Sequence, residues 1–287
     1  MVRKSHRAGY KGNRAKITTN LPKFGRMNLT LEGRNAIICG SSQGIGLAIA
    51  RELALMGANC CLFARNEEKL RSALDSLHNS GRQKHEFYGI DFNDKVALQQ
   101  LINKICSEKN IHILVNNSGG PASGAITEAK EDQFIQAFNQ HLITAHVMTK
   151  AVINGMKKDG FGRIINIIST SVKIPLKNLG VSNTIRGAVA SWAKTMANEL
   201  GQFNITVNNV LPGFTKTERL ETIVDNTASK KSLDKAEVEK QMMEEVPSKR
   251  FGEPFEVAAV AAFLASPAAA YVNGVSIPVD GGRTGSI

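Results

Sequence analysis

The sequence predicts a single doubly wound α/β domain, in which helices cover both faces of a mostly parallel, seven-stranded sheet. Short apolar runs bounded by turn signals alternate along the chain with longer segments of helical period. Parallel strands are buried on both faces and therefore read as continuous apolar runs. The 287 residues, 42% of them hydrophobic, suffice for one large domain of this kind.

The strands are predicted at seven short apolar runs. The second run, NCCLF, is typical, because its cysteines stand where small hydrophobic side chains pack. No CxxC spacing occurs, so Cys39, Cys60, Cys61 and Cys106 are interpreted as packing residues and no metal site is expected. The predicted strands are 35–39, 59–63, 86–90, 111–116, 163–168, 205–211 and 274–279.

Helices are predicted between these strands, and one segment interrupts the alternation. Residues 214–250 are polar, rich in Lys and Glu and closed by Pro247, which predicts a mobile lid of short helices beyond a strand end. Ligands of open α/β sheets bind at those carboxyl ends. The predicted helices are 44–57, 66–79, 94–108, 131–157, 182–201 and 254–265.

The net charge of +11 is concentrated at the N-terminus, because residues 1–26 contain eight basic residues and no acid. We expect a disordered basic extension before a domain at 27–287; a transit peptide, or contact with nucleic acid or anionic lipid, are the alternatives. Nucleic acid is not favoured, since no recognition element accompanies the charge. Without a long apolar run or a secretory leader pattern, the sequence predicts a cytoplasmic protein with no membrane partner.

A glycine-rich turn, CGSSQGIG, joins the first strand to the first helix. Glycines permit the tight turn and let backbone N–H groups approach a pyrophosphate at the positive end of the helix dipole. The context on both sides therefore predicts a dinucleotide site. The turn residues expected to contact the cofactor are Gly40, Ser42, Gln43, Gly44, Ile45 and Gly46.

The end of the second strand predicts which dinucleotide binds. An acid there accepts hydrogen bonds from the ribose of NAD, whereas a basic residue accommodates the additional phosphate of NADP. This chain has Ala64 followed by Arg65. A guanidinium binds phosphate in a forked geometry, so NADP(H) is predicted and NAD(H) is the less favoured alternative. A solvated arginine at a helix start is the competing interpretation.

Several motifs in order along residues 27–287 resemble the short-chain dehydrogenase/reductase family. They are the glycine-rich turn, Asn116-Asn117-Ser118-Gly119 after the fourth strand, Leu211-Pro212-Gly213-Phe214, and Val279-Asp280-Gly281-Gly282 near the C-terminus. The resemblance implies a Rossmann-type fold and a homotetramer or dimer built on the helices near 131–157 and 182–201. The further cofactor contacts that it implies are Asp91, Asn117, Ser118, Gly119, Arg186, Pro212, Gly213 and Thr215.

The segment 162–200 resembles the catalytic segment of that family, where a strand-end Ser is followed 13 residues later by Tyr and four residues after that by Lys. Ser169 matches the Ser, but Ser182 and Arg186 stand at the other two positions. As i and i+4 on one helix they keep the geometry, while an aliphatic hydroxyl is a much weaker acid than a phenol and Arg does not release a proton. Arg186 could bind the nicotinamide ribose or a substrate carboxylate. Helix packing, or backbone bonding for Ser169, is the alternative.

The relay Asn of the family falls at His141. Histidine ordinarily titrates near neutrality, which makes His141 a candidate proton donor, with a satisfied core histidine as the alternative. No tyrosine replaces the missing phenol by position, because Tyr10, Tyr88 and Tyr271 fall in the extension, the third strand and the C-terminal motif.

The resemblance implies an NADP(H)-dependent oxidoreductase that interconverts a small carbonyl and a secondary alcohol, similar to 3-oxoacyl-carrier-protein reductases but with an atypical proton donor. The competing hypothesis is a catalytically silent dinucleotide-binding protein that serves as a sensor or a non-catalytic subunit. The sequence does not name the substrate, since the lid and loops carry no motif.

Overall fold

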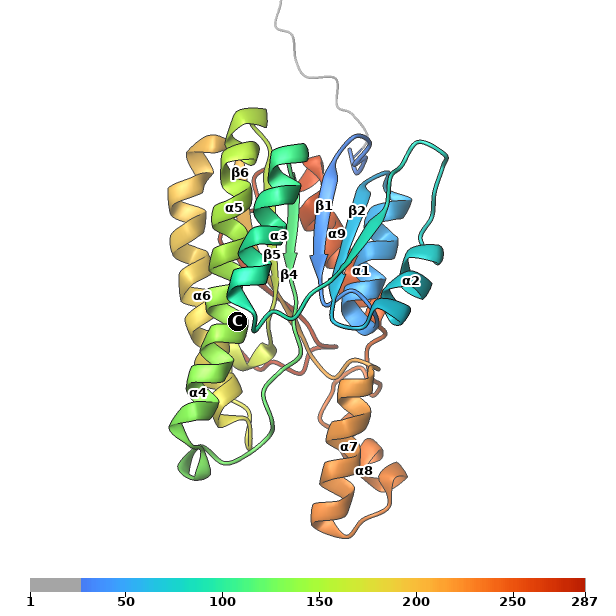
Figure 1. The fold of residues 1–287 in the computed structure, drawn as a ribbon. Helices are drawn as coiled ribbons and strands as arrows, with labels where there is room; N and C mark the ends of the chain where they lie inside the picture. The colour runs from blue at the N-terminus through green and yellow to red at the C-terminus, as the bar shows by residue number, and fades with distance from the viewer. Residues whose placement is uncertain (1–26, 287) are drawn as a thin grey trace, which may run out of the picture.

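A parallel sheet forms the centre of the computed structural model, which describes residues 27–286 (Figure 1). The strand order is β3-β2-β1-β4-β5-β6-β7, and every neighbouring pair is parallel. This order reverses direction between β1 and β4, so the predicted doubly wound class is confirmed. The strands are β1 Asn35–Cys39, β2 Asn59–Ala64, β3 Glu86–Gly89, β4 Ile113–Asn116, β5 Gly162–Ile167, β6 Ile205–Pro212 and β7 Ser276–Val279. The predicted basic extension, residues 1–26, lies outside the described residues.

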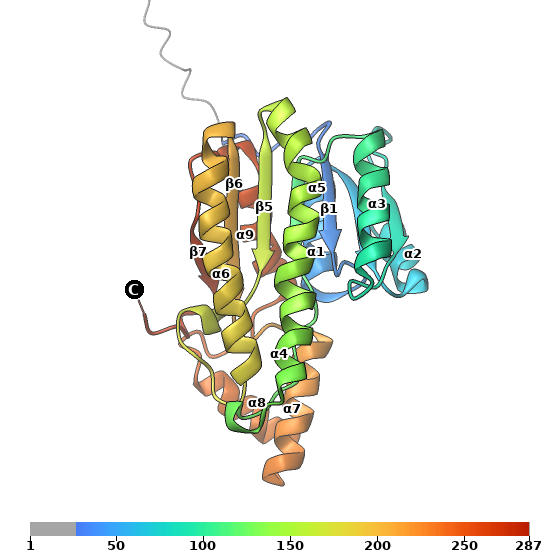
Figure 2. The ribbon, with the colours of Figure 1, turned by 60° about the vertical axis from the view of Figure 1, so that its left-hand side comes forward.

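Helices cover both faces of the sheet. The α-helices are α1 Gly44–Leu55, α2 Glu67–Asp75, α3 Lys95–Glu108, α4 Glu131–Phe138, α5 Thr144–Asp159, α6 Gly180–Leu200, α7 Glu218–Lys231, α8 Lys235–Glu244 and α9 Pro254–Ala265. In Figure 2, α3, α5 and α6 lie in front of the sheet, and α1 and α9 lie behind it. Successive strand residues alternate between the two cores: Ile38 packs with the α1 and α9 side, and Ile37 with the α3 and α5 side.

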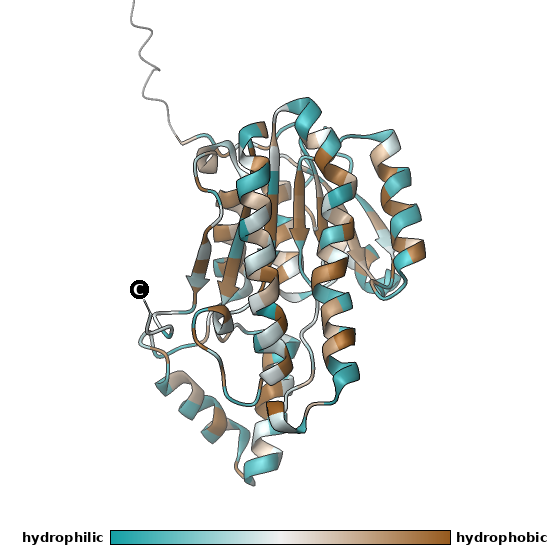
Figure 3. Cartoon of the chain, turned by 90° about the vertical axis from the view of Figure 1, so that its left-hand side faces the viewer, coloured by the Kyte–Doolittle hydropathy of each residue, from teal (hydrophilic) through white to brown (hydrophobic). Residues whose placement is uncertain are grey.

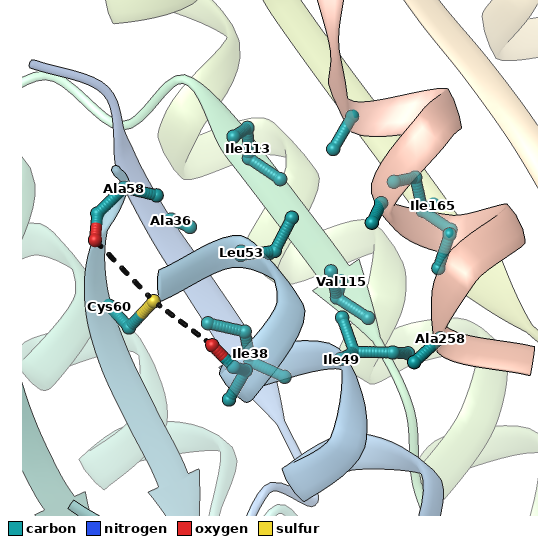
Figure 4. Packing of buried hydrophobic residues seen from close by; sticks show 14 of the residues in the cluster. Ala36, Ile38, Ile49, Leu53, Ala58, Cys60, Ile113, Val115, Ile165 and Ala258 are labelled. Atoms are coloured by element: carbon teal, nitrogen blue, oxygen red, sulfur yellow. Dashed lines mark hydrogen bonds between the residues drawn. The ribbon is translucent and has the colours of Figure 1, made fainter. Parts of the chain in front are cut away.

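The cores consist mainly of aliphatic side chains, and the strands that contribute to them are apolar (Figure 3). Figure 4 shows Ile38 and Val115 of the sheet against Ile49 and Leu53 of α1. The Cys60 thiol lies among them and donates to the backbone oxygens of Ala50 and Ala58. Cys39, Cys60 and Cys61 are buried and free, and Cys106 is half-buried, which fits their interpretation as packing residues.

Two helix and strand predictions differ from the structure in an informative way. The single helix predicted at 131–157 is two α-helices, α4 and α5, joined by the π-turn Asn139–Ile143. The Lys95 ammonium donates to the carbonyl oxygen of Asn139 at 2.9 Å, and so does the Thr144 hydroxyl at 3.0 Å. The wider turn is thus accompanied by one donor from α3 and one from the first residue of α5. At the other end of the sheet, β7 begins two residues later than predicted because Gly274 has φ +70°, outside the β region.

The segment predicted as a lid contains α7 and α8, which extend beyond the carboxyl ends of the strands (Figure 1). These helices share a small core of their own, formed by Leu220, Val224 and Ala228 of α7, Val238 and Met242 of α8, and Phe251. At its base the two ends of the segment are joined by the Thr215–Gly252 bridge and by edge contact between the rings of Phe214 and Phe251. Its movement as a lid stays a prediction.

A row of side-chain amides crosses the sheet near the carboxyl ends of its strands. Asn116 of β4 donates to Asn166 of β5, and Asn166 donates to Asn209 of β6, both at 2.9 Å. Asn209 donates in turn to the hydroxyl of Ser276 at 3.0 Å. Asn166 and Asn209 are buried, so this amide row satisfies polar groups inside the core.

No helix within residues 27–286 is long and apolar enough to cross a membrane.

Candidate active site

The glycine-rich turn after β1 is built for close backbone packing. Gly40 has φ +61°, and a Cβ there would lie 2.7 Å from the amide nitrogen of Asn117. A Cβ on Gly46 would overlap the carbonyl oxygen of Gly40. Helix α1 begins at Gly44 after Gln43, whose side chain does not cap it, and its first turn contains no acid. Its first N–H groups are therefore available to a phosphate.

The loop after β4 holds this turn in place. The Asn117 amide donates to the carbonyl oxygens of Cys39 at 3.2 Å and Gly40 at 3.1 Å. Ser118 extends towards the π-turn, where its hydroxyl lies 2.7 Å from Nδ1 of His141. The next residue, Gly119, has open space where its Cβ would stand. Of the three predicted cofactor residues of this loop, Asn117 thus contacts the glycine turn directly, and Ser118 contacts His141.

Arg65 and Asp91 lie after the ends of β2 and β3, respectively, on the same edge of the sheet, and both are exposed. An Asp91 carboxylate oxygen accepts from the backbone N–H of Asn93 at 2.9 Å. Because α2 follows at once, it brings a second cation, Lys69, to the glycine turn. Its ammonium donates to the Gln43 amide oxygen at 2.6 Å. Arg65 and Lys69 are thus two cations that could contact a phosphate here, although Lys69 also pairs with Glu218 at 3.2 Å.

The turn after β6 carries the remaining predicted cofactor residues. The Gly213 N–H donates to the Val279 carbonyl at 3.0 Å, and a Cβ on Gly213 would press on Asp280. Thr215 is buried and donates to the Gly213 carbonyl at 3.3 Å. Helix α7 then starts at the N-cap Thr217, whose methyl group lies 3.4 Å from where a Cβ of Gly44 would stand. The lid segment therefore lies against the glycine turn.

Ser169 follows β5 and caps a short 3-10 turn, with its oxygen accepting the Ser171 N–H at 3.1 Å. This contact is the backbone bonding anticipated as an alternative, yet it leaves the hydroxyl proton free to donate elsewhere. Ser182 and Arg186 lie one turn apart on α6, both buried. Arg186 donates from Nη1 to the Ile167 carbonyl at 3.1 Å, so the guanidinium reaches the end of β5 close to Ser169.

The π-turn directs His141 into the interior, where the side chain is 5% exposed. Burial first, then the positive charges of Arg186 and Lys95, lower the pKa of His141 to about 2. The imidazole is therefore neutral at working pH. This lowered pKa speaks against a His141 that titrates near neutrality; burial, followed by two cations from other parts of the chain, is the cause, and a lone helix position reveals neither. The role of His141 as a proton donor stays a prediction.

A small cavity lies behind the predicted reaction position. Its lining includes Asn116, Ser118, His141 and Arg186. Three buried polar atoms of these residues have no hydrogen-bond partner within residues 27–286: Oδ1 of Asn116, Nε2 of His141 and Nε of Arg186. The Asn116 oxygen accepts, the Arg186 Nε–H donates, and the His141 nitrogen does either according to its tautomer, so an ordered water could satisfy all three.

Neither tyrosine of the described residues supplies a phenol to this site. The Tyr88 hydroxyl donates to Glu86 at 3.0 Å on β3, and burial followed by Glu86 raises the pKa of Tyr88 to about 12. Tyr271 is fully exposed and precedes β7, so it lies at the amino end of that strand, away from the carboxyl ends of the sheet. Within residues 27–286, no group of three or more His, Cys, Asp or Glu side chains could hold a metal ion.

Sequence reasoning missed three cations of the site. Lys69 and Lys95 gave no signal, because a basic residue near a helix start is ordinary and their partners lie far away along the chain. Arg219 lies in the first turn of α7 and donates to the Pro121 carbonyl at 2.7 Å. Its position soon after the Pro-Gly turn was a usable signal, since that turn borders the expected nicotinamide position.

The fold and the glycine cradle define a dinucleotide-binding α/β protein, and comparisons give its family. Residues 40–284 match the family described as enoyl-(acyl carrier protein) reductase. The NADPH-dependent reductase BacG of Bacillus subtilis is 33% identical over 260 residues, 88% of this chain and 99% of the relative. A 3-oxoacyl-[acyl-carrier-protein] reductase of Vibrio cholerae is 32% identical over 257 residues, 88% of this chain and 98% of the relative.

A solved structure agrees with this relationship. L-sorbose reductase from Gluconobacter frateurii, complexed with NADPH and L-sorbose, superposes with a TM-score of 0.85 at 29% identity, covering 91% of this chain and all of that one. The chain belongs to the short-chain dehydrogenase/reductase family.

Proposed function

We propose that the protein is an NADP(H)-dependent oxidoreductase that interconverts a small carbonyl compound and a secondary alcohol. The observation that carries the proposal is the cradle formed by Gly40, Gly46 and Asn117 under the uncapped start of α1. This cradle fits a dinucleotide pyrophosphate, because the first N–H groups of α1 are uncapped, and the turn that presents them needs glycine at both positions, where a Cβ would collide with Asn117 or with the Gly40 backbone. Relatives named as NADPH-dependent, and a neighbour complexed with NADPH, support the choice of cofactor.

The residues of this chain divide the binding of the cofactor between them. Arg65 and Lys69 would hold the additional phosphate, the α1 turn the pyrophosphate, and Asn117, Pro212 and Thr215 the nicotinamide half. When bound, the cofactor supplies or accepts hydride. Its position at the carboxyl ends of the strands would present the reacting carbonyl to the Ser169 hydroxyl, whose proton remains free to stabilise a developing negative oxygen.

The proton that completes the alcohol has an atypical source in this proposal. Ser182 is too weak an acid to donate alone, and His141 carries no imidazolium proton at working pH. We infer that the proton comes from solvent through a water held in the cavity between Asn116, His141 and Arg186, and that the next water replaces the proton this water gives up, so that no hydroxide remains. The charge of Arg186 would make that water a better acid, and the neutral His141 would position it. Arg186, in the family's Lys position, borders this cavity with its Nε.

Turnover of a carbonyl panel with NADPH, followed at the nicotinamide absorbance band, tests the function. We expect oxidation of NADPH with at least one small ketone, and tighter binding of NADPH than of NADH in a fluorescence titration. Comparable affinity for the two cofactors would contradict the cofactor choice.

A catalytically silent dinucleotide-binding protein is the second candidate, favoured by Ser182 and Arg186 at the positions of the family's Tyr and Lys. The double change Ser182→Tyr with Arg186→Lys separates the two. A protein that binds NADPH but turns over substrates only after that change is a binding protein. A protein that is active beforehand is an enzyme with an unusual proton source.

A further inference from the structure

Two arginines from different parts of the chain meet over the loop after β4. Arg186 lies on α6 and is 7% exposed, whereas Arg219 lies on α7 of the lid segment and stays exposed. Their Nη2 atoms both lie within 4 Å of the point where a Cβ on Gly120 would stand, Arg219 at 3.5 Å and Arg186 at 3.9 Å. A side chain at position 120 would contact both guanidinium groups, and glycine keeps that space free.

No negative charge balances this pair. Within residues 27–286 neither arginine forms a salt bridge, and the buried Nε of Arg186 has no hydrogen-bond partner. The partners that the two side chains do have, Ile167 and Pro121, offer neutral carbonyl oxygens. Burial and then the nearby Arg219 lower the pKa of Arg186 to about 10, so it stays charged at neutral pH. Burying a cation without a counter-charge is costly, and an anion would remove that cost.

The pair also lies where a substrate would extend from the reaction position. Gly120 directly follows the cofactor loop of Asn117–Gly119, and Arg186 borders the same cavity as His141. The Nη1 of Arg186 donates to the Ile167 carbonyl at the end of β5, two positions before Ser169 in the sequence. An anion bound by both arginines would therefore lie beside the cofactor loop after β4, at the same end of the sheet as Ser169, which follows β5.

We propose that Arg186 and Arg219 together bind a carboxylate of the substrate, which makes the substrate class small oxo acids and the corresponding hydroxy acids. The inference rests on the proposed function, whose substrate it narrows. Guanidinium groups bind carboxylates through paired, charge-assisted hydrogen bonds, and two of them can share one anion. Because Arg219 lies on α7, the same anion links the lid segment to α6.

Calorimetric titration with tartrate and with threitol tests the site without any turnover. The two compounds share a four-carbon, hydroxylated skeleton, but only tartrate carries carboxylates. With the NADPH-loaded protein at low salt, we expect tartrate to bind and threitol not to bind measurably. Arg219→Gln should weaken tartrate binding about ten-fold or more, the usual loss of a charge-assisted contact. The matched control, Lys230→Gln, removes an exposed charge from the last turn of the same helix and should leave tartrate binding unchanged.

Three results would overturn the inference. Tartrate and threitol could bind equally, Lys230→Gln could weaken tartrate as much as Arg219→Gln, or Arg219→Gln could weaken NADPH rather than tartrate, which would assign the pair to a cofactor phosphate. Reduction of acetoacetate and its methyl ester separates this from the proposed function. A preference for the acid that is lost in Arg219→Gln supports both the carboxylate site and the proposed function. Preferential reduction of the ester overturns the carboxylate site alone. Tartrate binding without any turnover supports the carboxylate site but contradicts the proposed function.

Discussion

The neutral state of His141 predicts a specific loss of stability in acid. In the native protein the pKa of His141 is lowered to about 2, while an unfolded chain has an ordinary histidine pKa of about 6.5. Between these values the unfolded state binds a proton that the native state does not bind. Stability is therefore fully present above about pH 6.5 and falls as the pH is lowered towards the native pKa.

The size of this effect follows from the two pKa values. Lowering the pH from about 7 to about 5 should cost about 2 kcal/mol of unfolding free energy through His141 alone, at 1.4 kcal/mol for each pH unit below the unfolded pKa. Urea unfolding at both pH values measures it, in the unmodified protein and in His141→Asn. The pKa of His112 is also lowered, chiefly by burial, but His112 is present in both proteins and its contribution cancels.

The comparison between the unmodified protein and His141→Asn tests the native pKa of His141. His141→Asn should lose about 2 kcal/mol less than the unmodified protein between the two pH values, whatever its stability at neutral pH. If both proteins lose the same amount, His141 takes up a proton in the native state near its ordinary pKa. An imidazolium donor near neutrality would then be restored as a candidate, and the cavity water would lose its main support.

Three further changes test the cofactor site and the amide row. Arg65→Gln should weaken NADPH about ten-fold and leave NADH nearly unchanged, with Arg51→Gln on the outer side of α1 as a charge-matched control; a fluorescence titration reads both. Gly46→Ala should abolish NADPH binding, because the new methyl group overlaps the Gly40 backbone. Retained binding in the same titration would show that the glycine turn is not the cofactor site. Asn166→Ala should lower the free energy of unfolding by about 3 kcal/mol, because it leaves two amide groups of the row unpaired; urea unfolding measures this. The control Thr206→Val removes a buried hydroxyl that has no partner and should lower it by less than about 1 kcal/mol.

Most of the fold was accessible from the sequence because its signals are local. Apolar runs such as NCCLF mark strands that are buried on both faces. Pro254 marks the start of a helix, and α9 has the predicted bounds, 254–265. The π-turn at Asn139–Ile143 was not accessible. It adds one residue to a turn within a continuous helical pattern, and the Lys95 contact that accompanies it comes from a different helix.

The candidate site likewise contains features that the sequence predicts and features that only the structure reveals. The glycine turn and the Asn117 loop were predictable, since each is a contiguous motif whose conformation its own residues dictate. The meeting of Arg186 and Arg219 depends on how α7 folds back over the β4 loop, and 33 positions of sequence separate them. A side-chain pKa is likewise a property of neighbours in space, so the charge state of His141 had to await the structure.

The separate small core of α7 and α8 has a consequence for the kinetics of ligand exchange. A pair of helices that buries its own apolar side chains can swing as one body without exposing them to water. What it leaves behind on swinging is polar: the Lys69–Glu218 ion pair, the Gln43–Glu218 contact and the Arg219–Pro121 hydrogen bond. Salt screens the exposed ion pair but not the apolar core. If the segment moves as the predicted lid, the rate of its opening should therefore rise with ionic strength.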